Sequence, residues 1–254
     1  MKRVAITRPR KFLPAAEALL RSKGLEPVPV PMMELVPRDD GELEAFFDRL
    51  KAGAVDVVIV TSQNAVGFIF DRAADAAALR ERLNAVEVIS IGPKTSQALQ
   101  ERGIKANSVP STYSSDGLVQ DFPLAGKRVE VLRSDHGNPT LILGLDSGGA
   151  AVREVIVYDI VPLSGEEQVV FVRAALSGGI DAFTFTSTMT ARSLLMMGES
   201  MRALDELKRA INDKKVAVIG TPTAAFLKEN GIRVDVVPER FTFEDMIDAL
   251  IKVL

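Results

Sequence analysis

The sequence predicts an α/β protein built from two parallel-sheet domains, and three observations support this class. Short apolar runs of strand length alternate with helical segments along the 254 residues, as in a sheet covered by helices. Two of these runs, at 57–66 (VVIVTSQNAV) and 182–191 (AFTFTSTMTA), end in Thr-Ser and pass directly into a helix. In addition, the second half of the chain repeats the first.

The repeat is visible residue by residue. A shift of 125 residues places Arg8 on Arg133 and Ser62 on Ser187. After three extra residues the shift becomes 128, and nine residues of the segment 91–110 are identical to their counterparts in 219–238. This period is far too long for a solenoid, so the sequence indicates a duplicated α/β unit of the Rossmann or flavodoxin type.

The first half sets out the elements in order. We expect strands at 3–7, 55–61 and 86–91 and a short strand reaching 109–110, with helices at 13–23, 42–50, 63–71, 92–103 and 114–121. The segment 27–37 is extended but carries four prolines, which central strands reject because each removes a ladder hydrogen bond. We interpret it as an edge or linker strand. Its counterpart is 152–162, and the two together predict a pair of strands that bridges two domains.

Composition limits the classes of function. With 31 basic and 34 acidic residues the net charge is −3, so no basic surface favours nucleic acid or an anionic membrane. The chain has no cysteine, which fits a reducing cytoplasm, and its single histidine excludes a multi-histidine metal site. No apolar run approaches the ~20 residues of a membrane span, and the polar start is unlike a secretory signal. We expect a cytosolic protein without a bound metal.

The strand-to-helix junctions are the candidate ligand-binding positions. The hydroxyls of Ser62 and Ser187, with the free amides of the helices they precede, should lie at the carboxyl edge of a sheet, where anions are stabilised. The segments 92–95 (GPKT) and 220–223 (GTPT) also open helices, with glycine allowing close approach of a ligand. Each could equally be a plain helix cap. No P-loop or GxGxxG fingerprint follows a strand, which argues against a nucleotide or sugar-phosphate enzyme.

Five other residues have polar side chains that could serve function. For four of them ligand binding or catalysis competes with an ordinary surface role, and the fifth is expected to have a surface role only. Arg8 and Arg133 follow the first strand of each repeat and could bind a carboxylate or form surface salt bridges. Lys215 could bind a ligand or be a solvated lysine. Tyr158 lies in an aliphatic linker strand, where its hydroxyl could reach the surface or act as a donor in a binding cleft. We expect His136 at the surface.

Six short motifs together resemble uroporphyrinogen-III synthase. They are ITRP at 6–9, TSQNAV at 61–66, IGPKT at 91–95, REVIVY at 153–158, FTS at 185–187 and IGTPTA at 219–224. The likeness covers nearly the whole chain, and the order and spacing of the motifs carry it. In this second Gly motif Pro222 precedes Thr223, whereas some members have two adjacent threonines there.

The resemblance implies a fold and a reaction. One domain would comprise 1–35 and 164–254, the other 38–154, with linker strands at 27–37 and 152–163 and exchanged N-terminal strands. The cleft between the domains would bind the linear tetrapyrrole hydroxymethylbilane. The enzyme would remove water and close the ring with inversion of ring D to give uroporphyrinogen III, without a cofactor. We expect a monomer in transient contact with hydroxymethylbilane synthase. The alternative is a two-lobed sensor that binds an anion in the same cleft.

The resemblance also implies roles for individual residues. Tyr158 matches the family's cleft tyrosine and would assist departure of the substrate hydroxyl. The residues expected to bind the substrate's carboxylates are Arg8, Ser62, Gln63, Asn64, Thr95, Arg133, Ser187, Thr188, Lys215, Thr221 and Thr223.

Overall fold

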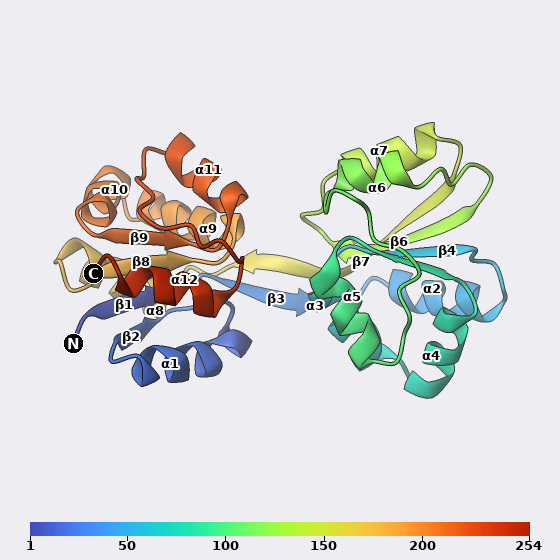
Figure 1. The fold of residues 1–254 in the computed structure, drawn as a ribbon, viewed down its shortest axis with the longest axis horizontal. Helices are drawn as coiled ribbons and strands as arrows, with labels where there is room; N and C mark the ends of the chain where they lie inside the picture. The colour runs from blue at the N-terminus through green and yellow to red at the C-terminus, as the bar shows by residue number, and fades with distance from the viewer. The chain divides into compact units, whose positions relative to one another are not determined.

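The computed structural model describes residues 1–254, which divide into two compact units. One unit comprises Met1–Glu34 and Val161–Leu254, and the other comprises Leu35–Ile160 (Figure 1). The chain leaves the first unit along strand β3 (Met33–Pro37) and returns along strand β7 (Ala151–Pro162). These strands are neighbours in one sheet.

The first unit contains a four-stranded sheet in the order β2-β1-β8-β9. Its strands are β1 (Arg3–Ile6), β2 (Glu26–Pro29), β8 (Ala182–Phe185) and β9 (Lys215–Val218), and every neighbouring pair is parallel. Strand β1, from the N-terminus, lies between β2 and β8, so both ends of the chain build this sheet. This pairing confirms the exchanged N-terminal strands.

Helices cover both faces of this sheet. A short 3-10 helix η1 (Arg10–Phe12) leads into α1 (Leu13–Ser22), which packs with α12 (Phe243–Ile251) in one apolar cluster with β1. The opposite cluster contains residues of the remaining four helices, α8 (Glu166–Leu176), α9 (Thr188–Ser200), α10 (Leu204–Asn212) and α11 (Thr221–Glu229).

The second unit contains a five-stranded sheet in the order β3-β7-β6-β4-β5. Strand β4 (Val57–Val60) pairs in parallel with both β5 (Glu87–Ser90) and β6 (Arg128–Ser134). Strand β6 in turn pairs in parallel with β7. One apolar cluster takes residues from α2 (Glu42–Lys51), α3 (Gln63–Arg72), α4 (Ala76–Asn84) and α5 (Pro93–Glu101). The other takes them from α6 (Ser115–Asp121) and α7 (Thr140–Ser147).

The burial of β4 shows why its sequence is continuously apolar. All four residues are buried, with Val58 and Val60 in one cluster and Val57 and Ile59 in the other. A parallel strand covered on both faces has no position for a solvated side chain. Each such side chain contributes roughly 1.5–3 kcal/mol relative to exposure.

Three features differ from the sequence prediction. The segment 27–37 is two edge strands, β2 and β3, rather than one linker strand, since each pairs in a different sheet. The expected strand reaching 109–110 is only an isolated bridge between Ile89 and Ser108, and the first unit's equivalent joins Ala217 to Val236. Helix α4 and its counterpart in the repeat, α10, were not predicted. The fold class itself, α/β with parallel sheets, is confirmed. No helix combines the length and apolar character that a membrane span needs.

Candidate functional site

The strand order identifies the edge of each sheet where a ligand would bind. In the first unit the order reverses at β1, which lies between β2 and β8, and in the second it reverses at β6, between β7 and β4. In open α/β sheets, ligands bind beyond the carboxyl ends of the strands at such a reversal. The carboxyl edge of each sheet is therefore the expected ligand-binding edge of its unit.

A hydrogen-bonded Tyr158–Ser62 pair lies at the carboxyl edge of the second unit. The Tyr158 Oη and the Ser62 Oγ are 3.0 Å apart. Ser62 is the N-cap of α3, and its Oγ also accepts a hydrogen bond from the Ala65 amide at 3.0 Å. The Tyr158 ring is stacked on Phe68, with centroids 5.0 Å apart. Tyr158 as a whole is only 4% exposed, so its side chain is buried in the second unit.

This pair leaves one hydroxyl proton available. Between them the two hydroxyls have two protons, and their mutual hydrogen bond uses one. If Ser62 donates to Tyr158, the phenol keeps its own proton for a third acceptor. Because the Ser62 Oγ is already fixed by the Ala65 amide, the phenol oxygen is positioned by both its ring stack and its hydroxyl partner. The geometry suits a hydrogen-bond donor in a fixed place.

Helix N-termini supply further donors in the second unit. Gln63 and Asn64 follow Ser62 in the first turn of α3. Gly92 precedes α5, no side chain caps this helix, and Thr95 lies in its first turn and is buried. The amides of a first helical turn have no intrahelical acceptor and carry a partial positive charge, so they stabilise an anion.

Arg133 lies at the same edge, but its charge is already neutralised. It is 5% exposed, its Nε donates to the Glu154 carboxylate at 2.5 Å, and its Nη1 donates to the Asn138 carbonyl at 2.6 Å. Arg133 is thus buried and ion-paired, and it does not form the surface salt bridge considered from the sequence. Arg133, Ser62 and His136 line a hollow of about 190 Å³.

His136 is half-exposed, as expected from the sequence. Its Nδ1 lies 2.8 Å from the Asp135 Oδ1, and its side chain is 43% exposed. The Asp135 carboxylate also accepts the amide of Ile160. No group of three or more histidine, aspartate or glutamate side chains is placed to hold a metal ion.

The carboxyl edge of the first unit repeats this arrangement. Ser187 caps α9 by accepting the Thr190 amide at 3.2 Å, and Thr188 is the first residue of that helix. Gly220 precedes α11, which opens with Thr221 and the buried Thr223, again without a side-chain cap. The proline between these threonines has no N–H, so it removes one amide from this edge while suiting the first helical turn.

Arg8 differs from the other two charged candidates, Arg133 and Lys215, because it has no hydrogen-bond or acidic partner. It follows β1, and its guanidinium carbon lies 5.0 Å from the centre of the Phe12 ring and 4.7 Å from that of Phe243. Its Nε is buried without an acceptor, which costs about 1–3 kcal/mol when left unsatisfied. Burial lowers the pKa of Arg8, but an arginine remains charged at neutral pH.

The structure does not bring Lys215 to this edge. Lys215 is the first residue of β9, so it lies at the amino end of the strand, whereas Thr221 follows the carboxyl end. Its ammonium pairs with the Asp235 carboxylate at 3.7 Å and is partly exposed. It is a solvated lysine in an ion pair.

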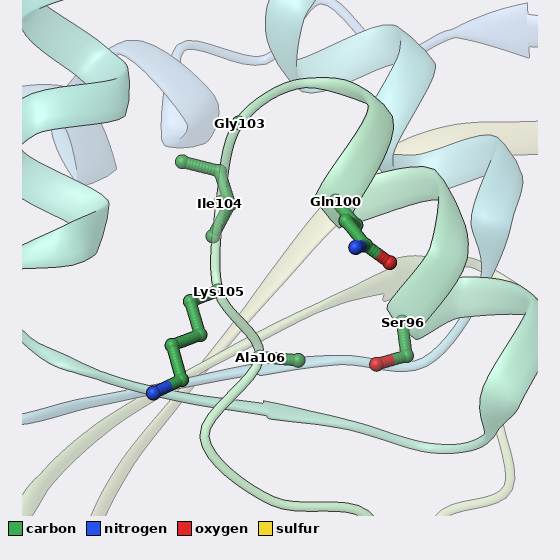
Figure 2. Close-up of a pocket in the computed structure, with 6 residues that line it drawn as sticks. All are labelled: Ser96, Gln100, Gly103, Ile104, Lys105 and Ala106. Atoms are coloured by element: carbon green, nitrogen blue, oxygen red, sulfur yellow. The ribbon is translucent and has the colours of Figure 1, made fainter.

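The other hollows lie away from the candidate residues. One of about 440 Å³ lies beside α5, between Ser96 and Gln100 on the helix and residues 103–106 of the segment that follows (Figure 2). Its one charged side chain, Lys105, points away from Ser96 and Gln100. Nothing in this hollow combines acid, base and nucleophile.

The fold and these edges define a two-unit α/β protein of the doubly wound class, with hydroxyls and helix amides at the carboxyl edge of each sheet. The family model of uroporphyrinogen-III synthase HemD matches residues 15–248. The chain belongs to this family.

Individual relatives agree with the family match. The chain is 35% identical to a putative uroporphyrinogen-III synthase of Archaeoglobus fulgidus, over 98% of this chain and 97% of that one. It is 26% identical to the uroporphyrinogen-III synthase of Chlorobaculum parvum, over all of both chains. A crystal structure of a mutant uroporphyrinogen III synthase from Thermus thermophilus superposes with a TM-score of 0.71 at 23% identity, covering 99% and 98% of the two chains.

These comparisons confirm the family and the enzyme class inferred from the sequence, and they do not support the sensor alternative. The chain is an enzyme of tetrapyrrole biosynthesis.

Proposed function

We propose that the chain converts hydroxymethylbilane to uroporphyrinogen III, and that Tyr158 donates a hydrogen bond to the departing hydroxyl. The observation that carries the proposal, beyond the family, is the buried Tyr158–Ser62 pair at the carboxyl edge of the second sheet. In this reaction the hydroxyl of the ring A hydroxymethyl group leaves as water. Ring D then closes onto the freed carbon through a spiro intermediate, which inverts that ring.

Control of substrate conformation is the larger part of this task. The linear tetrapyrrole loses its hydroxyl readily and can close without an enzyme to the type I isomer. A protein that yields type III must therefore hold the chain in the geometry that leads to the spiro intermediate. Strong acid or base groups are not required for that, which fits an edge made of hydroxyls and amides.

The substrate's eight carboxylates match the donors at the two edges. In the second unit the proposed donors are the first turns of α3 and α5, with Ser62, Gln63, Asn64 and Thr95. In the first unit they are the first turns of α9 and α11, with Ser187, Thr188, Thr221 and Thr223, together with Arg8. Fixed amide donors stabilise carboxylates without a basic surface, consistent with the net charge of −3.

The role of Tyr158 is supportive. A phenol that donates to the leaving oxygen stabilises the negative charge that develops there, and it needs no shifted pKa to do so. Ser62 orients the phenol through their hydrogen bond. We include in the proposal a cytoplasmic monomer that takes up hydroxymethylbilane as hydroxymethylbilane synthase releases it, because a substrate that closes spontaneously is best transferred quickly.

Complementation of a bacterium that lacks its own uroporphyrinogen-III synthase tests the proposal. Expression of the chain should restore growth without added haem, and extracted porphyrins should be the type III isomer. Accumulation of type I porphyrins alone, with the chain present in the soluble fraction, would exclude the proposed activity.

A further inference from the structure

Two arginines related by the internal repeat have different surroundings. Arg8 follows β1 and Arg133 lies near the end of β6, at equivalent positions of the two units. Arg133 donates to a carboxylate and to a backbone carbonyl, as described above. Arg8 donates to neither kind of acceptor, and its Nε is buried. Both units therefore have the arginine, but only the second unit has acceptors for it.

Strand register explains the missing acid. In the second sheet Val131 pairs with Glu154, the partner of Arg133. In the first sheet the equivalent pair is Ile6 with Pro29. A proline thus stands at the position equivalent to Glu154, so the acidic partner of Arg133 has no counterpart for Arg8.

The two phenylalanines that contact Arg8 also replace smaller residues. Phe12 corresponds to Gly137, over which Arg133 folds so closely that a Cβ would lie 2.5 Å from the arginine Nε. Phe243 corresponds to Ser115, and the residues before these two, Thr242 and Ser114, both cap their helices. In the first unit the extra space is filled by two rings, one from η1 and one from α12, and Arg8 contacts both.

This arrangement holds a cation firmly without neutralising it. Aromatic faces attract a guanidinium but provide no acceptor for its N–H groups. The planar fork of an arginine matches a carboxylate in two parallel hydrogen bonds, and an arginine already fixed loses little freedom when such a ligand binds. Ser187 and the first turn of α11 lie at the same carboxyl edge of this sheet.

We propose that Phe12 and Phe243 are positioning residues that hold the Arg8 guanidinium for one carboxylate of the tetrapyrrole, whereas Arg133 serves the fold. This inference rests on the proposed function, because it identifies which arginine binds that substrate and what places it. It also makes the two units unequal, since only the first unit offers an unpaired guanidinium to the substrate.

Kinetics of variants test the positioning role. Phe243→Leu and Phe12→Leu should each raise KM about 5- to 10-fold with a smaller change in kcat, and Phe243→Tyr, which keeps the ring, should stay within about twofold of wild type. Phe226→Leu is the matched control, because Phe226 contacts Arg192 at 4.8 Å in a pair outside the proposed binding residues. Circular dichroism and thermal unfolding check that each variant is folded. A wild-type KM in both Phe12→Leu and Phe243→Leu, each shown to be folded, would overturn the proposal.

Proton–nitrogen NMR of the arginine side chains provides a readout that does not depend on turnover. The Arg8 Nε–H signal, identified by its loss in Arg8→Lys, should move when uroporphyrinogen III is added under nitrogen. The Arg133 signal should not move, because its Nε is bonded to Glu154. In Phe243→Leu the Arg8 signal should change in the free protein and need about 5- to 10-fold more ligand to move.

The two sets of results separate the failure of this inference from failure of the proposed function. If type III product forms but the Arg8 signal does not move when uroporphyrinogen III is added, the inference is wrong and the proposed function is unaffected. Absence of type III product with an Arg8 signal that responds to the ligand would instead remove the function and leave an anion site. Movement of the Arg133 signal alone would assign the carboxylate to the other arginine and so contradict the inference.

Discussion

Replacing Tyr158 with phenylalanine removes one oxygen atom from the proposed donor and leaves its surroundings intact. The ring stays stacked on Phe68, and Ser62 keeps its hydrogen bond from the Ala65 amide, so the N-cap of α3 persists. In the free protein the substitution breaks only the 3.0 Å hydrogen bond between the two hydroxyls. Without this bond the free energy of unfolding should fall by about 0.5–1.5 kcal/mol.

The catalytic effect should be larger than the effect on stability. A hydrogen bond to an oxygen that is becoming negatively charged is worth about 1.5–3 kcal/mol, which corresponds to a roughly 10- to 150-fold lower kcat. Activity should not disappear, because the hydroxyl of this substrate leaves readily and the carboxylate donors remain. KM should change little, since Tyr158 is proposed to act on the leaving group and not on the carboxylates.

The assay follows uroporphyrinogen III formed from hydroxymethylbilane that is generated in place, with urea unfolding measured on the same samples. Tyr113→Phe removes the same atom from a tyrosine that is 63% exposed and should leave both kcat and stability at wild-type values. A folded Tyr158→Phe enzyme with wild-type kcat would refute the role given to the phenol.

Three further changes test other parts of the structure. Glu130→Ala should lower the free energy of unfolding by about 3–5 kcal/mol, because the Glu130 side chain is 3% exposed and its removal leaves the Arg49 guanidinium without its carboxylate partner. Urea unfolding measures this difference, and a decrease below about 1 kcal/mol would contradict the prediction. Side-chain and backbone hydrogen bonds from Arg128 hold the pKa of Asp56 below its ordinary value of 3.8. The ionised Asp56 carboxylate therefore stabilises the fold fully above about pH 3.8, and this stabilisation is lost as the pH falls and the carboxylate is protonated. The unfolding curves of wild type and Asp56→Asn should therefore converge in acid, and a constant difference across pH would exclude the linkage. Ser187→Ala should cost about 1 kcal/mol of stability by uncapping α9 and should raise KM, and an unchanged unfolding midpoint would show that this cap is not needed.

The sheets were predictable because their strands carry strong signals. The run at 57–60 is apolar at every position, which a strand buried on both faces requires, and the repeat places an equivalent strand at 182–185. The prolines of the segment 27–37 correctly indicated edge strands. They could not show where the segment divides, because β2 and β3 are defined by different partners, β1 and β7, which are distant in sequence.

Helix α4 has a local sequence signal, although it was not predicted. Asp75 precedes a run of good helix formers, and its carboxylate accepts the amides of Ala77 and Ala78 at 2.9 and 3.0 Å. Such a cap before AAALRERL is a standard indication of a helix start. The short strand expected to reach 109–110 was overestimated, since this segment forms only a single bridge, between Ser108 and Ile89.

The parts of the candidate site that depend on strand direction and helix capping could be predicted from the sequence. Thr-Ser after an apolar strand predicted that Ser62 and Ser187 would lie at helix starts, and both serines cap their helices. Strand direction could also have placed Lys215 at the amino edge of the sheet, because it begins a strand. The difference between Arg8 and Arg133 could not be predicted, since it depends on which residue of a neighbouring strand faces each guanidinium.

The central claim is that this chain directs ring closure to the type III isomer. Hydroxymethylbilane is generated in place by its synthase, the products are oxidised to porphyrins, and the type I and type III isomers are separated by chromatography. We expect mainly type III, in an amount that depends on this protein, against type I in its absence. Only type I product in the presence of the folded protein would contradict it.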